Sequence, residues 1–189
     1  MKKVRYGIIG FGAFAERAIL PAIRAAHNAE VVAVQKRSMD AARQKSQEHG
    51  IPHYFDSAEK LLASNDIDAV FIVSANSEHY RETLAAAKAG KHVLVEKPMA
   101  VSATQAKEMI RACNTAGVKL MVGHMLRFSP LIRRMKEIVQ TGMIGEIIAA
   151  QSHFIYDVSM SKRHWVLQQE AAGGGPLFDI GIHCLDTIR

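Results

Sequence analysis

The chain has 189 residues, and 49% of them are hydrophobic, which is enough for one full domain and part of another. Its net charge of +6 does not indicate nucleic-acid binding, because Lys and Arg form no long run and only 6% of residues are aromatic. No apolar run approaches the ~20 residues of a membrane span. Cys113 and Cys184 match neither a metal spacing nor a disulfide framework, so we expect reduced thiols in a cytoplasmic protein.

In chain order, short apolar runs alternate with helical patterns over the first 123 residues. The expected strands are 4–9, 31–34, 53–55, 69–73, 93–95 and 119–122. The expected helices are 14–26 with a kink at Pro21, 41–49, 58–62, 78–89 and 102–116. Continuous apolar strands that alternate with helices predict a doubly wound parallel sheet, a Rossmann-type α/β fold over residues 1–123.

A different pattern follows Gly123. Residues 130–141 have the spacing of a basic amphipathic helix, and residues 147–157 form an expected strand with polar positions interleaved. An irregular loop over 158–176 contains three consecutive glycines, and a helix is expected from 177 to 189. We therefore expect residues 124–189 to begin a second α+β domain, mostly antiparallel sheet, that is incomplete in this chain.

The first strand–helix junction has the spacing of a dinucleotide-binding turn, Gly-x-Gly-x-x-Gly/Ala. The first glycine allows the tight turn, the second allows a pyrophosphate to approach, and Ala15 allows close helix packing. The helix N-terminus then offers N–H groups to the phosphates. The residues expected to contact the cofactor here are Gly10, Phe11, Gly12, Ala13 and Phe14.

The second strand is followed by Lys36, Arg37 and Ser38, where NAD-preferring domains place an acidic residue. Two cations and a hydroxyl suit a 2′-phosphate, so this cluster predicts NADP as the cofactor, with NAD possible. The alternative is a solvated basic loop, since exposed Lys and Arg are common.

Polar residues also follow the strands that end near residues 73 and 95. Asn76 is expected to bond a cofactor ribose or amide, while Ser77 is an alternative helix cap. Lys97, fixed by the following proline and oriented by Glu96, can donate or accept a proton in a cleft. The alternative is a lysine in a surface turn.

Asp179 and His183 are four residues apart in the last expected helix, so they share one helical face. Such a pair can handle protons, because histidine titrates near neutrality and the aspartate can orient it or bind a substrate hydroxyl. The alternative is an inert helix pair. A metal site is not expected, because no third ligand accompanies the two.

Four stretches, taken together, resemble the Gfo/Idh/MocA oxidoreductases, which include glucose–fructose oxidoreductase and inositol dehydrogenase. They are the Gly10–Ala15 turn, the Val-Glu-Lys-Pro strand end at 95–98, the 123–130 segment and the Gly-rich 173–183 segment. The resemblance implies an active-site group of Lys97, Asp179 and His183. It also implies hydride transfer between a nicotinamide and a secondary alcohol or carbonyl of a sugar, polyol or related compound. The residues expected near the cofactor in these later stretches are Ser74, Asn76, His79, Glu96, Lys97 and Arg127.

The chain departs from the family pattern at three points. Ser74-Ala75-Asn76 lacks the usual turn proline, and Trp165 is followed by Val166 instead of arginine. Family chains are also roughly twice as long, and their additional strands form the substrate wall and the subunit interface of what is expected to be a homo-oligomer. A nicotinamide-binding sensor or subunit without catalysis, and an inactive cofactor-binding fragment, are the alternative functions.

Overall fold

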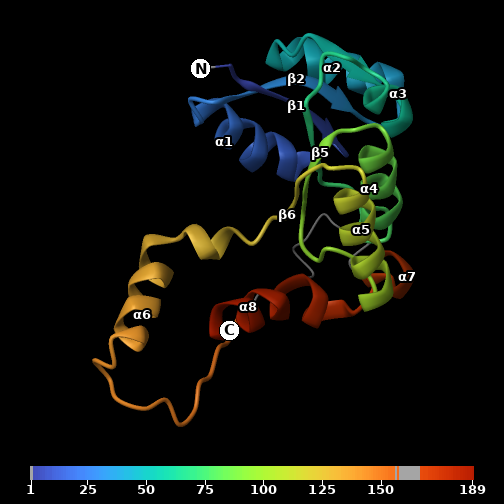
Figure 1. The fold of residues 1–189 in the computed structure, drawn as a ribbon. Coiled ribbons are helices and arrows are strands. Elements are labelled where there is room, and N and C mark those ends of the chain that lie inside the picture. Colours follow the sequence, from blue (N-terminus) through green and yellow to red (C-terminus); the bar gives the residue numbers. More distant parts are fainter. Residues whose placement is uncertain (1, 156, 158–166) are drawn as a thin grey trace. The chain divides into compact units, whose positions relative to one another are not determined.

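A computed structural model of the chain describes residues 2–155, 157 and 167–189 (Figure 1). The chain divides into two compact units, Met1–Val122 and Gly123–Arg189. None of the described helices is both long enough and apolar enough to cross a membrane.

The first unit is built on a six-stranded sheet, in which every neighbouring pair of strands is parallel. The strand order is β3-β2-β1-β4-β5-β6, so the chain reverses its direction of travel across the sheet between β1 and β4. The strands are β1 (Val4–Ile9), β2 (Ala29–Gln35), β3 (His53–Phe55), β4 (Ala69–Ile72), β5 (His92–Val95) and β6 (Leu120–Val122). This confirms the predicted doubly wound fold, and its ligands are expected at the switch point between β1 and β4.

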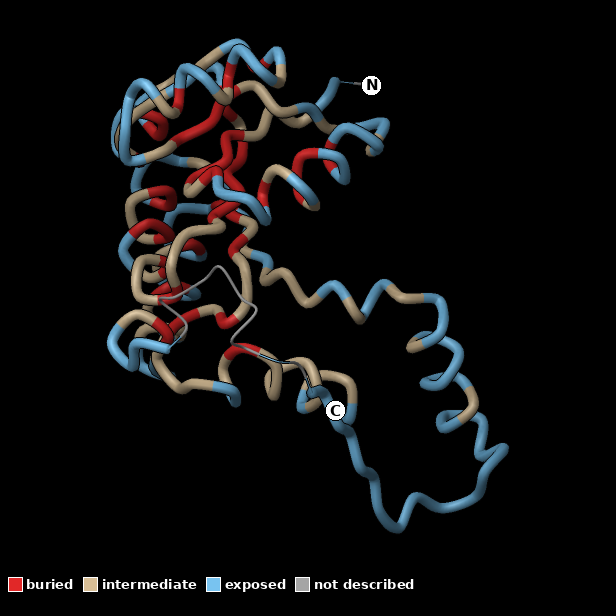
Figure 2. The backbone as a smooth tube through the Cα atoms, turned by 180° about the vertical axis from the view of Figure 1, so that it is seen from behind, coloured by how far each residue is buried: buried red, intermediate tan, exposed pale blue. Residues whose placement is uncertain are grey.

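Helices cover both faces of this sheet. Successive residues of a strand face opposite sides, and Ile8 and Ile9 accordingly belong to two separate buried clusters. The Ile9 cluster includes side chains of α3 (Ala58–Leu62), α4 (His79–Lys88) and α5 (Ala103–Thr115). The Ile8 cluster includes side chains of η1 (Ala15–Ile19) and α1 (Leu20–Ala25). Figure 2 shows these buried positions concentrated along the strands and the helix faces turned toward them.

The first helix differs from its prediction. Instead of one α-helix kinked at Pro21, the chain forms the π-helical segment η1 and then α1, with Pro21 in the first turn of α1. The backbone N–H of Leu20 bonds to the carbonyl of Ala15, five residues earlier. This wider spacing moves the proline ring away from the preceding turn, with which it would clash in a regular α-helix.

Side-chain caps explain where three other helices of the first unit begin. Ser38, Ser57 and Ser102 each accept a hydrogen bond from a backbone N–H in the first turn, at the starts of α2 (Met39–His49), α3 and α5. The alternative role of Ser77 as the cap of α4 is wrong, because the N-cap position is Glu78 and no side chain caps it.

The register brings four strand ends to one line. Ile9 is paired with Gln35 of β2 and with Ile72 of β4, and Ile72 is paired with Val95 of β5. The residues that follow these ends therefore leave the sheet along the same edge. This edge carries the dinucleotide turn, the basic cluster, the Asn76 loop and the Lys97 turn.

The second unit is helical in its described residues. It contains η2 (Met125–Phe128), α6 (Pro130–Gln140), α7 (Gln169–Ala172), η5 (Leu177–Gly181) and α8 (Ile182–Ile188). The strand expected over 147–157 is wrong for the residues of that range that the structure describes, which have no regular structure. A strand needs a partner for its backbone hydrogen bonds, and no strand lies among the described residues of this unit. Trp165 and the other residues of 158–166, about half of the expected loop, lie outside the described residues.

Candidate active site

Gly10 makes the tight turn at the end of β1. Its φ of 81° is a left-handed conformation that a side chain disfavours. A Cβ added at Gly10 would lie 2.8 Å from the backbone nitrogen of Ser74, at the end of β4. The glycine therefore allows close contact between the two strand ends that flank the switch point.

Gly12 has a different role in the turn. Its backbone N–H donates to the carbonyl of Gly10 at 2.6 Å, and its carbonyl accepts from Glu16 N as the helix begins. A Cβ built on Gly12 would have only the carbonyl oxygen of Gly10 within 4 Å, at 3.8 Å. Gly12, Ala13 and Phe14 are exposed, so this side of the turn is open to a ligand. The geometry fits the pyrophosphate approach that the motif predicts.

Gln35, a residue that the motif analysis missed, holds the turn from β2. Its side-chain Oε1 accepts from Gly10 N at 3.0 Å, and its Nε2 donates to the carbonyl of Asp56 at 3.3 Å. Its backbone carbonyl also accepts from Phe11 N at 2.9 Å. The sequence signal that could have found it is a polar residue at the end of an apolar strand, and the structure shows that residue buried. The side chain of Phe11 is itself buried, so Phe11 contributes its backbone to the turn.

The basic cluster lies directly beside this turn. Lys36 Nζ donates to the carbonyl of Phe11 at 2.7 Å, and burial lowers the pKa of the Lys36 ammonium, with a smaller contribution from the charge of Lys45. Arg37 is exposed, and Ser38 accepts from Ala41 N as the cap of α2. The two cations therefore differ, because Lys36 is bound to the turn and Arg37 faces solvent.

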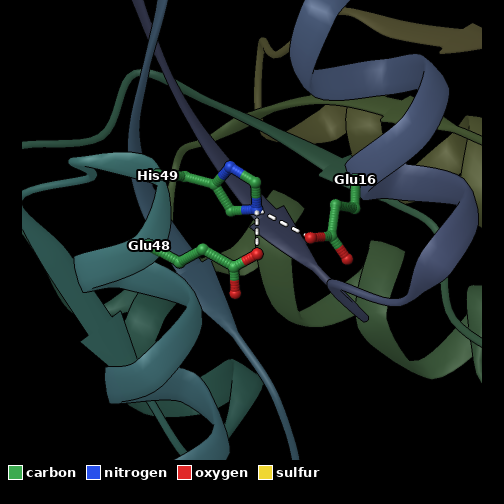
Figure 3. A group of neighbouring side chains, drawn as sticks. All are labelled: Glu16, Glu48 and His49. Carbon is green, nitrogen blue, oxygen red and sulfur yellow. Dashed lines mark hydrogen bonds and ion pairs between the residues drawn. The ribbon is translucent and has the colours of Figure 1, made fainter.

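A compact ionic network joins η1 to α2 near the turn (Figure 3). Ligand atoms of Glu16, Glu48 and His49 lie within 4.8 Å of one another, which is compatible with a metal ion. Lys45 Nζ lies 2.7 Å from Glu16 Oε1 and 2.9 Å from Glu48 Oε2. The pKa of the Glu16 carboxyl is lowered by its hydrogen bond with Lys45 and, to a smaller extent, by that with His49. The Lys45 ammonium bridges both carboxylates, so the group is an ion-pair network between the two helices.

The loop after β4 is held from inside the protein. Asn76 is buried, with 6% of its surface exposed, and His79 is fully buried. His79 Nδ1 lies 2.8 Å from the carbonyl oxygen of Pro98, and Nε2 lies 3.3 Å from that of Ser74. The sequence predicts His79 near the cofactor, and in the structure its ring joins the loops that follow β4 and β5. Burial lowers the pKa of the imidazole.

Lys97 follows β5 and is partly buried. Its backbone N–H donates to Glu96 Oε2 at 3.1 Å, so Glu96 holds the backbone of the turn. Burial raises the pKa of the Glu96 carboxyl, and the Lys97 N–H opposes this shift. Residue Pro98, after a cis peptide bond, supplies the carbonyl that faces His79.

The remaining predicted residues lie in the second unit. Asp179 is buried in η5, and His183 lies four residues later in α8, where its ring stacks on Phe154 with centroids 6.2 Å apart. Arg127 is predicted near the cofactor, and within its own unit it pairs with Asp186, with Nη2 2.6 Å from Oδ1. This pairing lowers the pKa of the Asp186 carboxyl.

Comparison with known proteins agrees with this geometry. Residues 4–124 match the model described as "Oxidoreductase family, NAD-binding Rossmann fold", and residues 132–189 match the model of the GFO/IDH/MocA C-terminal domain. The chain belongs to the GFO/IDH/MocA oxidoreductase family. This confirms the resemblance seen in the sequence motifs.

Several relatives are named as sugar or diol reductases or dehydrogenases. The chain is 38% identical over 185 residues to 1,5-anhydro-D-fructose reductase of Ensifer adhaerens, covering 98% of this chain and 55% of the relative. It is 33% identical to D-xylose 1-dehydrogenase (NADP(+)) 2 of Haloferax volcanii, covering 97% of this chain and 56% of the relative. It superposes with a TM-score of 0.87 and 32% identity on an aldose–aldose oxidoreductase of Caulobacter crescentus solved with glycerol. This match covers 100% of this chain and 57% of the other. The chain thus spans about half the length of the relatives it matches.

Proposed function

We propose that this chain is the dinucleotide-binding part of an NADP(H)-dependent oxidoreductase acting on a secondary alcohol or carbonyl of a sugar, polyol or related compound. The observation that carries the proposal is the strand register. It brings the Gly12 turn, the Lys36–Arg37 cluster and the Lys97 turn to the same edge of the sheet. This edge is where open α/β sheets bind their ligands.

The residues of the first unit fit a phosphorylated dinucleotide. Gly12 leaves open space where a pyrophosphate approaches, and the exposed start of the following helix provides backbone N–H groups. Lys36 and Arg37 supply positive charge at the end of β2, the position that distinguishes a 2′-phosphate from a hydroxyl. The relative from Haloferax volcanii carries NADP(+) in its name, which supports the same preference.

When bound, the nicotinamide gives or takes a hydride at its C4 atom. The protein's own task is to hold the substrate and move the hydroxyl proton. We propose that the side chains of Lys97 and His183 move this proton, which their protonated forms supply in reduction and their neutral forms take in oxidation. Asp179 holds a substrate hydroxyl or His183. The backbone of Lys97 is held by Glu96, and the neighbouring Pro98 carbonyl faces the ring of His79.

Calorimetric titration of the chain with NADPH and with NADH tests the cofactor. We expect NADPH to bind more tightly, and tighter binding of NADH would refute the NADP preference. Absence of binding by both would refute the function itself. A panel of ketoses, inosones and sugar acids, followed by NADPH absorbance, then tests the substrate class. Cofactor binding without turnover over this panel would favour a non-catalytic role.

A further inference from the structure

Glu82 is a buried carboxyl group that the proposed chemistry does not use. It lies in α4 with 6% of its surface exposed, and its Oε2 is 2.5 Å from the hydroxyl oxygen of Ser74. An acidic side chain is seldom buried unless a partner holds it. The hydrogen bond to Ser74 offsets part of the cost of burying the Glu82 carboxyl.

Ser74 lies directly against the dinucleotide turn at Gly10. Its backbone nitrogen and Cα lie 2.8 and 2.9 Å from the place of a Cβ on Gly10. Its carbonyl oxygen faces His79 Nε2, and its hydroxyl bonds to Glu82. The position of Ser74 against Gly10 is therefore set from α4 by two side chains.

We propose that Glu82 is a positioning residue for the dinucleotide, because its hydrogen bond to the Ser74 hydroxyl holds the loop after β4 against the Gly10 turn. The proposal rests on the proposed function, since it assumes that this turn binds the cofactor. Glu82 touches neither Gly10 nor the open side of the turn through any hydrogen bond in the part of the chain that the structure describes, so it acts through Ser74.

The protonation of Glu82 gives this contact a second consequence. Burial raises the pKa of the Glu82 carboxyl to about 7, and the Ser74 hydrogen bond opposes the rise. Glu78 and Arg81 on the same helix and Glu59 on α3 also act on its charge, and the buried His79 ring lies at the same loop. Above neutral pH a buried negative charge is then bonded to Ser74, next to the turn proposed to bind the phosphates, where it disfavours a bound anion.

Three variants test the positioning role by calorimetry with NADPH and NADH. Glu82→Leu removes the hydrogen bond, and we expect it to weaken dinucleotide binding about three- to tenfold, the range of one net hydrogen bond. Ser74→Ala should weaken binding to a similar extent. The double variant should be no weaker than either single variant, because both changes remove the same contact. Glu137→Gln is the matched control, since it removes an exposed charge of α6 whose partner is Arg134.

Glu82→Gln separates charge from hydrogen bonding. The amide keeps a partner for the Ser74 hydroxyl and cannot ionise, so its affinity should match the unmodified chain at pH 6. Between pH 6 and pH 8 the unmodified chain should lose dinucleotide affinity relative to this variant. The titration of the dinucleotide's own phosphates affects both proteins equally and cancels in this comparison. Unchanged binding by Glu82→Leu in a folded chain, or additive losses in the double variant, would overturn the proposal. If the unmodified chain binds no dinucleotide, the proposed function fails instead.

Discussion

Gln35 and Gly10 are joined directly across β2 and β1, where Gln35 Oε1 accepts a hydrogen bond from the backbone N–H of Gly10 at 3.0 Å. The same side chain donates to the carbonyl of Asp56 after β3. One buried amide therefore ties the ends of three strands together at the edge where the dinucleotide turn begins.

Replacing this amide with an apolar side chain should loosen the turn. In Gln35→Leu, the Gly10 N–H and the Asp56 carbonyl both lose their partner, so we expect a loss of about 1–3 kcal/mol in the free energy of unfolding. Urea denaturation measures it, and dinucleotide titration should show a parallel loss of affinity. Gln44→Leu, in an exposed position of α2, is the matched control. Equal stability of the two variants would contradict the role of Gln35.

Gly10 and Gly50 offer a test that separates backbone strain from crowding. Both have positive φ, 81° and 61°, but a Cβ on Gly10 would meet Ser74, whereas nothing lies within 4 Å of a Cβ on Gly50. Gly50→Ala should lower the free energy of unfolding by about 1–2 kcal/mol, because alanine only has to adopt the left-handed conformation. Gly10→Ala should cost clearly more, because backbone atoms of β1 and β4 must also separate. Thermal unfolding of the two variants compares them, and a similar loss in both would show that the strand ends are free to separate.

Arg37 should decide the choice between the two cofactors. It is the exposed cation of the cluster, whereas Lys36 bonds to the Phe11 carbonyl. Arg37→Ala should weaken NADPH about tenfold and leave NADH nearly unchanged, because only NADPH presents a 2′-phosphate for a charge-assisted bond. Titration with both nucleotides gives the ratio. Arg43→Ala, also exposed but paired with Asp40 in α2, serves as the control. A similar loss of NADH affinity would assign Arg37 to a shared part of the cofactor.

The sheet could be predicted from the sequence because its strands carry their own signal. Val4–Ile9, His53–Phe55 and Ala58–Leu62 have the predicted bounds, since apolar runs and flanking turn residues mark them locally. The strand expected over 147–157 has the same local signal but depends on partner strands, which the pattern cannot supply. The π-helical segment η1 was also beyond sequence reasoning, because it reflects how Pro21 is accommodated in three dimensions.

Parts of the candidate site were visible as motifs, and the contacts that hold them were not. The Gly-x-Gly turn and the residues around Lys97 stand where the motifs place them, at the carboxyl ends of strands. The bonds from Gln35 to Gly10 and from Glu82 to Ser74 join residues of different elements. Their geometry depends on packing, which a single sequence does not describe. His79 shows the same limit, because its full burial and its contacts with both loops are visible only in the structure.

Glu82 should make stability depend on pH in a recognisable way. The pKa of its carboxyl in the folded state is raised from 4.5 to about 7. Its contribution to the free energy of unfolding is therefore fully present below about pH 4.5 and is lost as pH rises through 7. At about 1.4 kcal/mol for each pKa unit, the loss is about 3 kcal/mol. Glu82→Gln does not titrate, so its free energy of unfolding relative to the unmodified chain should rise by about this amount between pH 4.5 and 8. Urea denaturation at several pH values measures this difference, and a constant difference would show that Glu82 is ionised throughout.

Lys97 tests the proposed proton transfer apart from cofactor binding. Lys97→Met keeps much of the side-chain length and removes the ammonium group, so we expect nearly unchanged NADPH affinity and a rate of hydride transfer lower by about 10²–10⁴-fold, as for loss of a general acid or base. Single-turnover oxidation of NADPH, with the carbonyl compound found in the substrate panel, measures this rate. Lys107→Met, at an exposed position of α5, is the matched control. Equal rates for Lys97→Met and the unmodified chain would remove Lys97 from the mechanism, whereas a loss of NADPH affinity with an unchanged rate would make it a cofactor-binding residue.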